Sequence, residues 1–300
     1  MKRALLTLAA TLSLLAASAQ KTITVDTSAD EIVRLWDNTT AKHSNEMVKD
    51  EVIKNRFKVY NTSSTDLYIF TAPKEKATGY AMVIFPGGGY RYLSFPLTFP
   101  EWCRDNGITA VVVKYRLPNL GHPQATIEDA IGAVEYMRAN AEKYNIDPDK
   151  IGVYGNSAGG HLAAWVSNAM EDGKKPCYSI LIYGAMTRDT FYNSYNSAMQ
   201  MCGKHPTAEE FVKYSTPDMV TSTTPPALIL LSDDDTTVPS LSSTAYYKAL
   251  KRHGVPASMH IYPSGGHGWS GRLKWEYRQQ WLGAVKDWIN RLEEIKASRK

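Results

Sequence analysis

A serine, a histidine and a run of aspartates stand in settings that could support nucleophilic acyl transfer in this 300-residue chain. They are Ser157, His267 and the acidic residues at 233–235. A serine hydroxyl needs a base to take its proton, and the base needs a carboxylate to hold its tautomer. If the fold brings the three groups together, the chain can cleave an ester through an acyl-serine intermediate.

Ser157 lies in Gly-Asn-Ser-Ala-Gly at 155–159, between an apolar run at 151–154 and a segment rich in small residues. A serine on a sharp strand-to-helix turn needs neighbours of glycine size two positions before and after it. The alternative is an ordinary serine cap on a helix. The context favours a nucleophile, and the helix start would aim the N–H of Ala158 at a developing oxyanion.

A second glycine-rich segment, Pro-Gly-Gly-Gly-Tyr at 86–90, follows the apolar run at 81–85. Consecutive glycines lose much backbone entropy on folding, so they are favoured where N–H groups must approach something closely. We predict that Gly88 and Gly89 form the second half of an oxyanion hole, opposite Ala158. A flexible loop is the alternative. A phosphate loop is disfavoured because no Gly-Lys-Ser/Thr follows.

His267 has the setting of a catalytic base among the seven histidines. It lies in Ser-Gly-Gly-His-Gly-Trp at 264–269, where glycines on both sides let an imidazole project from a loop. His161 falls in a predicted helix and His260 in a predicted strand, where a structural role is the better interpretation. We therefore predict that His267 takes the serine proton.

The carboxylate that would orient His267 lies among Asp233, Asp234 and Asp235, which follow the apolar run at 227–231. Any of them could stabilise an imidazolium, and physical reasoning from the residues does not choose among them. A calcium loop is disfavoured because its ligands alternate along the chain and end on a glutamate, which is absent here.

The framework that must position these residues is predicted from periodicity. Apolar, β-branched runs alternate with segments of helical spacing, which predicts an α/β fold with a mostly parallel sheet covered by helices on both faces. Residues 61–66 are predicted to form a turn, and 20–60 an N-terminal extension packed on the sheet, within one domain spanning 20–300. The predicted strands are 67–70, 81–85, 109–113, 151–154, 179–182, 227–231 and 258–262, and the predicted helices are 127–141, 159–170, 244–253 and 281–292.

Composition limits the classes of partner. With 43% hydrophobic and 21% charged residues the chain is not generally disordered. Its formal net charge is +4 and it has no basic run interleaved with aromatic residues, so nucleic acid is not an expected partner, and no protein partner is predicted. Cys103, Cys177 and Cys202 allow at most one disulfide. The lack of CxxC and of a histidine cluster predicts no metal and no cofactor.

The first 19 residues have the features of a secretory signal peptide. Lys2 and Arg3 precede an apolar stretch at 4–17, and Ala-Ser-Ala at 17–19 fits the small-x-small cleavage rule. The stretch is shorter than the roughly 18 to 20 apolar residues of a membrane anchor. We expect an exported chain, periplasmic or extracellular, that begins at Gln20 and does not associate with a membrane.

Four stretches give the chain a specific resemblance to the α/β-hydrolases: 86–90, 155–161, Asp-Thr-Thr-Val-Pro at 235–239, and Gly-His-Gly-Trp at 266–269. Within that superfamily it resembles the carbohydrate-esterase group of bacterial acetyl xylan esterases and feruloyl-esterase-like proteins, over nearly all of the mature length. The resemblance implies the chain order serine, aspartate, histidine, with the aspartate of Asp-x-x-Val-Pro as the acid. It therefore selects Asp235. Many relatives have histidine where Pro86 stands.

The sequence says least about which residues contact the substrate. Tyr90, Tyr92 and Trp269 lie beside predicted catalytic residues and are the candidates for lining the site, while no charged residue near the motifs indicates an ionic substrate. Residues 186–226 are much longer than an ordinary connection and predict a cap-like insertion that could form part of the pocket wall. The alternative is that its side chains only pack it onto the domain; they are Phe191, Tyr192, Tyr195, Met199, Met201, Phe211 and Tyr214.

Together these observations predict a secreted serine esterase, and the resemblance favours acetyl or similarly small acyl groups on plant polysaccharide such as xylan or its oligosaccharides. A feruloyl or general carboxylesterase would use the same residues with a wider acyl pocket. A peptidase of the prolyl-oligopeptidase type is disfavoured because no propeller-sized domain is present. A non-catalytic carbohydrate-binding module on a hydrolase fold is disfavoured by the complete Ser, Asp and His set.

Overall fold

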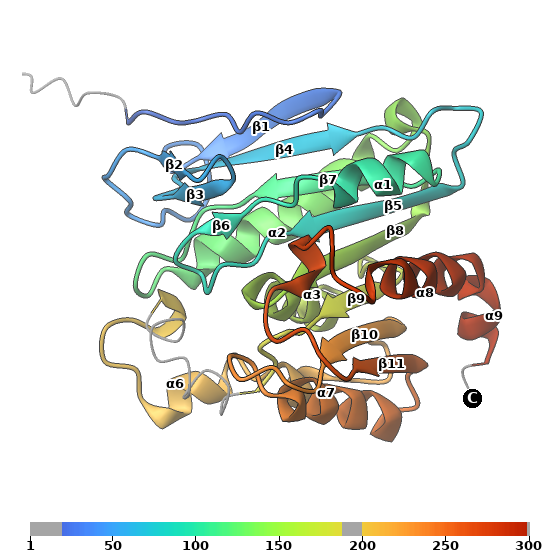
Figure 1. Ribbon diagram of the computed structural model, residues 1–300. Coiled ribbons are helices and arrows are strands. Elements are labelled where there is room, and N and C mark those ends of the chain that lie inside the picture. The colour runs from blue at the N-terminus through green and yellow to red at the C-terminus, as the bar shows by residue number, and fades with distance from the viewer. Residues whose placement is uncertain (1–19, 188–199, 299–300) are drawn as a thin grey trace, which may run out of the picture.

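The centre of the molecule is an eight-stranded sheet, seen in the computed structural model, which describes residues 20–187 and 200–298 (Figure 1). In the sheet order, neighbouring strands from β7 to β11 run parallel, and β4 pairs antiparallel with both β1 and β7. This confirms the predicted sheet. The strands lie in the order β1 (Glu31–Asp37), β4 (Ser64–Phe70), β7 (Thr109–Lys114), β5 (Gly79–Phe85), β8 (Ile146–Asn156), β9 (Ser179–Ile182), β10 (Ala227–Ser232) and β11 (Ala257–Tyr262).

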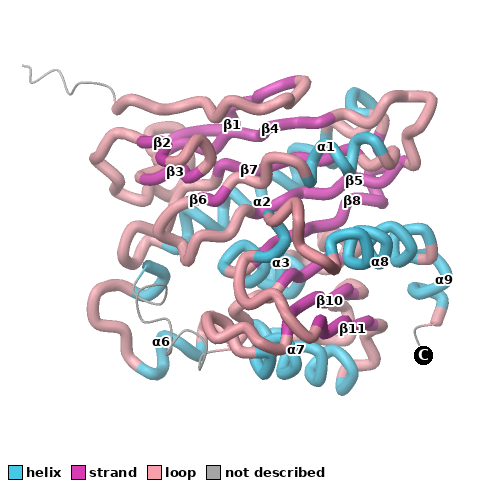
Figure 2. Tube along the Cα trace, viewed as in Figure 1, coloured by secondary structure: helices cyan, strands magenta, loops and turns pink. Residues whose placement is uncertain are grey.

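Helices cover both faces of this sheet, as expected (Figures 1 and 2). The connections β5 to β7 and β7 to β8 run toward opposite edges, and right-handed crossovers of that kind place their helices on opposite faces. Phe99 of α1 and Trp281 of α8 meet with ring centroids 5.3 Å apart, which joins these two helices on one face. The helices are α1 (Phe99–Asp105), α2 (Pro123–Ala139), α3 (Ala158–Ala169), α7 (Ser240–Arg252), α8 (Arg278–Asn290) and α9 (Leu292–Ala297), with short helical turns η1 (Glu142–Tyr144) and η3 (Trp269–Gly271).

The N-terminal extension does more than pack on the sheet, because β1 is one of its edge strands. The predicted turn at 61–66 is also too long, since Ser64 begins the fully buried strand β4. The polar residues of β4 meet a buried cation: Lys114 Nζ on β7 lies 2.7 Å from Asp66 and 2.7 Å from Glu51, and donates to Ser64 Oγ at 3.0 Å. Because the first residues of β4 are polar and pair with this buried charge, their composition is the same as that of a turn, which is why the sequence predicted one.

A small second sheet lies beside the catalytic end of the large one and has no counterpart among the predicted elements. It consists of β2 (Val52–Lys54), β3 (Lys58–Tyr60) and β6 (Leu93–Ser94). Val59 and Leu93 pair across it and are fully buried. Because side chains alternate along strands, Lys58, Tyr60 and Ser94 face the opposite way. Strands of two or three residues are too short to give a periodic signal.

Part of the insertion at 186–226 is described, as α6 (Ala208–Val212) and the helical turn η2 (Thr216–Met219). Met201 is buried and Tyr214 packs partly against the core, which matches the packing alternative for these two residues. Phe191, Tyr192, Tyr195 and Met199 lie outside the described residues. Across the described ranges, no helix has both the length and the apolar character that a bilayer span requires.

Candidate active site

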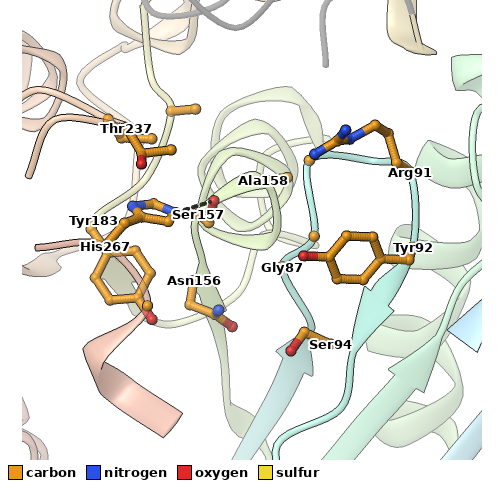
Figure 3. Close-up of a pocket in the computed structure, with 15 residues that line it drawn as sticks. Gly87, Arg91, Tyr92, Ser94, Asn156, Ser157, Ala158, Tyr183, Thr237 and His267 are labelled. Atoms are coloured by element: carbon orange, nitrogen blue, oxygen red, sulfur yellow. Dashed lines mark hydrogen bonds between the residues drawn. The ribbon is translucent and has the colours of Figure 1, made fainter. Parts of the chain in front are cut away.

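The predicted serine, histidine and aspartate form a continuous hydrogen-bonded row at the carboxyl ends of the parallel strands. Ser157 Oγ lies 2.8 Å from His267 Nε2 (Figure 3). On the other side of the ring, His267 Nδ1 lies 2.7 Å from Asp235 Oδ2. The Asp235 side chain is 1% exposed and that of His267 is 22% exposed. With the proton on Nδ1 donated to the buried carboxylate, Nε2 is left to accept the proton of the serine hydroxyl.

Ser157 sits between β8 and α3 with φ 56° and ψ −122°, a backbone conformation that L residues rarely adopt. The flanking glycines make this turn possible. A Cβ on Gly155 would lie 2.0 Å from the carbonyl oxygen of Gly159, and a Cβ on Gly159 would lie 2.0 Å from that of Phe85. Both contacts are with backbone, which cannot move aside. The Gly-x-Ser-x-Gly pattern is therefore a packing requirement of the turn.

The three predicted oxyanion donors, Gly88, Gly89 and Ala158, all line the cavity that holds Ser157 and His267. Within the described chain none of their N–H groups donates to an internal acceptor, so all three are available to a ligand. Gly88 has φ 136°, and a Cβ there would meet the carbonyl oxygen of Tyr92 at 2.0 Å. Their role as donors stays a prediction.

Pro86, in the glycine-rich loop, supplies no side-chain donor. The loop is held instead by the Tyr115 hydroxyl, which donates to the Pro86 carbonyl oxygen at 2.7 Å.

The three adjacent aspartates have three different settings. Asp235 Oδ1 accepts the backbone N–H groups of Thr237 and Val238, each at 2.9 Å, which leaves Oδ2 for His267. Asp234 accepts the N–H groups of Gly266 at 2.7 Å and Gly265 at 3.1 Å, and these bonds lower the pKa of its carboxyl. Asp233 is exposed, and among the residues that the structure describes its single hydrogen bond is from its backbone N–H to the carbonyl oxygen of Tyr262. Asp234 thus supports the loop that carries His267, a role that no local sequence signal indicates.

That loop has two further supports that sequence reasoning missed. Arg272 donates to the carbonyl oxygens of Gly265 at 2.9 Å and His267 at 2.8 Å. The Tyr183 ring lies 4.8 Å from the His267 ring and joins the wall of the cavity. Tyr183 follows β9, so only the parallel pairing of β9 with β8 and β10 brings it to the site.

Two of the three predicted substrate contacts are corrected. Tyr90 is fully buried, and its hydroxyl bonds His161 Nδ1 at 2.7 Å below the site. Trp269 is also fully buried and stacks on Trp275 with centroids 4.2 Å apart. Tyr90 has φ 57°, which turns its side chain into the core although the residues on either side reach the cavity. Tyr92 does line the cavity, and its contact with substrate stays a prediction.

The expectation that no charged residue near the motifs indicates an ionic substrate is also corrected. Arg91, between Tyr90 and Tyr92, is exposed and lines the cavity across from His267 (Figure 3). Within the described residues its guanidinium has no hydrogen-bond or ion-pair partner. The signal was present in the sequence as a single basic residue directly after the glycine motif, which local patterns do not distinguish from an ordinary surface arginine.

His161 has the structural role that its helix position favours. It is fully buried, with Nδ1 on the Tyr90 hydroxyl and Nε2 2.7 Å from the carbonyl oxygen of Tyr214. Burial lowers its pKa to about 4, so the ring is neutral at pH 7. Since Tyr214 belongs to the 186–226 insertion, His161 ties this segment to α3. His260, the other histidine interpreted as structural, is instead exposed on the edge strand β11.

Comparisons with known proteins place the chain in a family. The alpha/beta hydrolase fold family matches residues 82–271. An acetylxylan esterase of Xylanibacter ruminicola is 33% identical over 222 residues, covering 72% of this chain and 46% of that protein. Endo-1,4-beta-xylanase B of Butyrivibrio fibrisolvens is 30% identical over 204 residues, covering 62% of this chain and 32% of that protein. The chain therefore spans less than half the length of these relatives.

Among solved structures, an acetyl ester-xyloside bifunctional hydrolase from Caldicellulosiruptor lactoaceticus superposes with a TM-score of 0.75 at 28% identity, covering 89% of this chain and 98% of that one. A sugar hydrolase from Lactococcus lactis superposes with a TM-score of 0.65 at 26% identity, covering 83% and 99%. Both structures are matched over almost their whole length.

Proposed function

Because the chain belongs to the alpha/beta hydrolase fold family, we propose that it is a serine esterase that removes acetyl or similarly small acyl groups from plant polysaccharide such as xylan or its oligosaccharides. The observation that carries this proposal is the row from Ser157 through His267 to Asp235, set against three N–H groups free to bind an oxyanion. The names of the acetylxylan esterase and xylanase relatives support the substrate class.

The reaction follows from the positions of these atoms. His267 Nε2 takes the proton of Ser157 as Oγ attacks the ester carbonyl, and the N–H groups of Gly88, Gly89 and Ala158 stabilise the oxyanion by about 3 kcal/mol per donor. The imidazolium gives its proton to the sugar oxygen, which leaves as an alcohol. His267 then takes a proton from water, and the hydroxide attacks the acyl-serine. The imidazolium returns this proton to Ser157 Oγ as the carboxylic acid is released.

The size of the cavity favours a small acyl group. Its volume is about 210 Å³, below the roughly 300 to 1,000 Å³ of pockets that enclose drug-sized ligands. A feruloyl group would need more room on the acyl side. Acetyl, butyryl and feruloyl esters of p-nitrophenol therefore separate the two acyl classes.

The test is acetate release from acetylated xylan by residues 20–300, with Ser157→Ala as the matched inactive variant. We expect release from wild type and a loss of several orders of magnitude in the variant, because the three side chains act as a unit. Turnover of activated esters with inert xylan would overturn the substrate, and undiminished hydrolysis by Ser157→Ala would overturn the nucleophile.

We also propose that the chain is exported after cleavage between Ala19 and Gln20, on the strength of the leader-like sequence at 1–19. The intact mass of the chain recovered outside the cytoplasm tests this. A mass that retains the first 19 residues would contradict it.

A further inference from the structure

A second cavity of about 470 Å³ adjoins the catalytic one and takes no part in the reaction steps above. The two share Arg91 and Tyr92 in their walls. Tyr60 lines the second cavity from β3, Asn61 lines it from directly after that strand, and Asn119 lines it from the loop after β7. If the substrate is a polysaccharide, its chain cannot fit in about 210 Å³ and must leave the catalytic cavity. The shared wall is a direct route.

The small sheet makes that wall continuous. Ser94 lines the catalytic cavity, Tyr92 lines both cavities and Tyr60 lines the second. Lys58 pairs with Ser94 in the small sheet. Tyr60 is two residues from Lys58 and Tyr92 is two residues from Ser94, and side chains two residues apart on a strand point to the same side, so the two tyrosines lie on the same face. Their ring centroids are 5.1 Å apart. A tyrosine pair of this kind offers apolar ring surface for the C–H groups of a sugar and hydroxyl groups that can hydrogen-bond to the hydroxyls of the sugar.

The wall is also positively charged. Arg91 and Lys49 line the second cavity, whereas Glu46 is the single carboxylate that lines it among the described residues. Beside it, Lys54 Nζ lies 5.1 Å from the centre of the Tyr60 ring and Lys58 Nζ 5.0 Å from that of Tyr92. The Arg91 guanidinium has no partner in the described chain. A planar guanidinium binds a carboxylate through two parallel hydrogen bonds, so the arrangement suits an anionic group on the ligand.

We propose that the second cavity binds the glycan chain beyond the esterified sugar, that it prefers a chain carrying a uronic acid, and that Arg91 determines this preference. This inference rests on the proposed function for the identity of the leaving group. Arg91 would hold the uronate carboxylate where the two cavities meet, and the Tyr60 and Tyr92 side chains would contact the neighbouring sugar. The ester would then be presented to Ser157 by the part of the substrate that does not react.

Binding to the inactive Ser157→Ala chain tests the proposal without catalysis. Isothermal titration compares a neutral xylotetraose with a xylo-oligosaccharide of similar length that carries one glucuronic acid. We expect about tenfold tighter binding of the uronate, the worth of one well-formed charge-assisted pair. The preference should disappear in Arg91→Gln, persist in part in Arg91→Lys and shrink at high salt. Arg252→Gln on α7, an exposed arginine, is the control for the same change of charge and should keep it.

Equal affinity for the two oligosaccharides, no binding of either, or a preference that survives Arg91→Gln would overturn the proposal. Tyr60→Ala should weaken both ligands and Tyr60→Phe should weaken them less, because the ring is retained. Acetate release separates this inference from the proposed function. Release from acetylated xylan with no uronate preference refutes the second cavity alone. An Arg91-dependent preference without release from any glycan supports the second cavity and refutes the esterase substrate.

Discussion

Replacing each of the three consecutive aspartates by asparagine is expected to give three different results, although their residue type alone does not distinguish them. In Asp235→Asn the side chain keeps one oxygen, which can either accept from His267 or remain with the N–H groups of Thr237 and Val238. Leaving a buried donor without an acceptor costs about 1–3 kcal/mol. Two backbone donors outweigh one imidazole, so the oxygen stays with the backbone and the amide NH₂ faces His267.

The imidazole must then accept at Nδ1 and carry its proton on Nε2, which faces Ser157. In that tautomer it cannot take the serine proton. A wrong tautomer of this kind lowers kcat by about 10,000-fold, or roughly 5 kcal/mol of transition-state stabilisation. Asp234→Asn loses one of its two loop contacts and should cost about tenfold or less. Asp233→Asn, at an exposed side chain, should change kcat less than about twofold.

The assay is steady-state hydrolysis of p-nitrophenyl acetate by the three variants at neutral pH, with circular dichroism and thermal unfolding to confirm that each is folded. The low-field proton resonance of His267 Nδ1–H should be visible in wild type and in Asp233→Asn, and absent in Asp235→Asn. A larger loss of kcat at Asp233 or Asp234 than at Asp235, in folded variants, would refute both the assignment of the acid and the tautomer argument.

Three further predictions concern the scaffold, and urea unfolding measures each. Gly155→Ala places a Cβ against backbone and should destabilise the chain by more than about 4 kcal/mol. Gly283→Ala in α8 is the control: it has open space around it and should stabilise the chain by about 0.5–1 kcal/mol. Equal effects of the two variants would contradict the claim that Gly155 is required for packing at the Ser157 turn. His161 takes up a proton near pH 6.5 in the unfolded chain but only near pH 4 in the folded chain. The free energy of unfolding should therefore be highest above pH 6.5 and fall by up to about 3 kcal/mol as the pH drops to 4. His161→Gln should remove this dependence on pH; an unchanged dependence would show that another group is responsible. Lys114→Met leaves its buried carboxylate partners without a cation and should cost about 3–5 kcal/mol. Lys174→Met, at an exposed ion pair, is the control and should leave the free energy of unfolding almost unchanged; equal losses in the two variants would refute a special contribution of the buried cluster.

Much of the framework is readable from the sequence because its signals are local. The predicted strand at 179–182 has the same bounds in the structure, and the helix predicted at 159–170 differs by one residue at each end. The β-branched runs and helical stripes each lie within one element, so the period of the pattern identifies it. The small sheet and the polar start of β4 were not predicted. Short strands carry no period, and Ser64 and Asp66 are polar residues that are buried in contact with Lys114.

The sequence by itself determined the turn at Ser157 and the loop at His267, since both depend on glycines whose steric consequences reach only the next few residues. The tertiary structure decided which side chains meet. It placed Asp235 rather than its neighbours against His267, sent Tyr90 and Trp269 into the core, and brought Arg91 to the junction of two cavities. These outcomes depend on how strands far apart in the chain pair and how their loops face one another. Apart from the family pattern at 235–239, which selects Asp235, no pattern of neighbouring residues records such contacts.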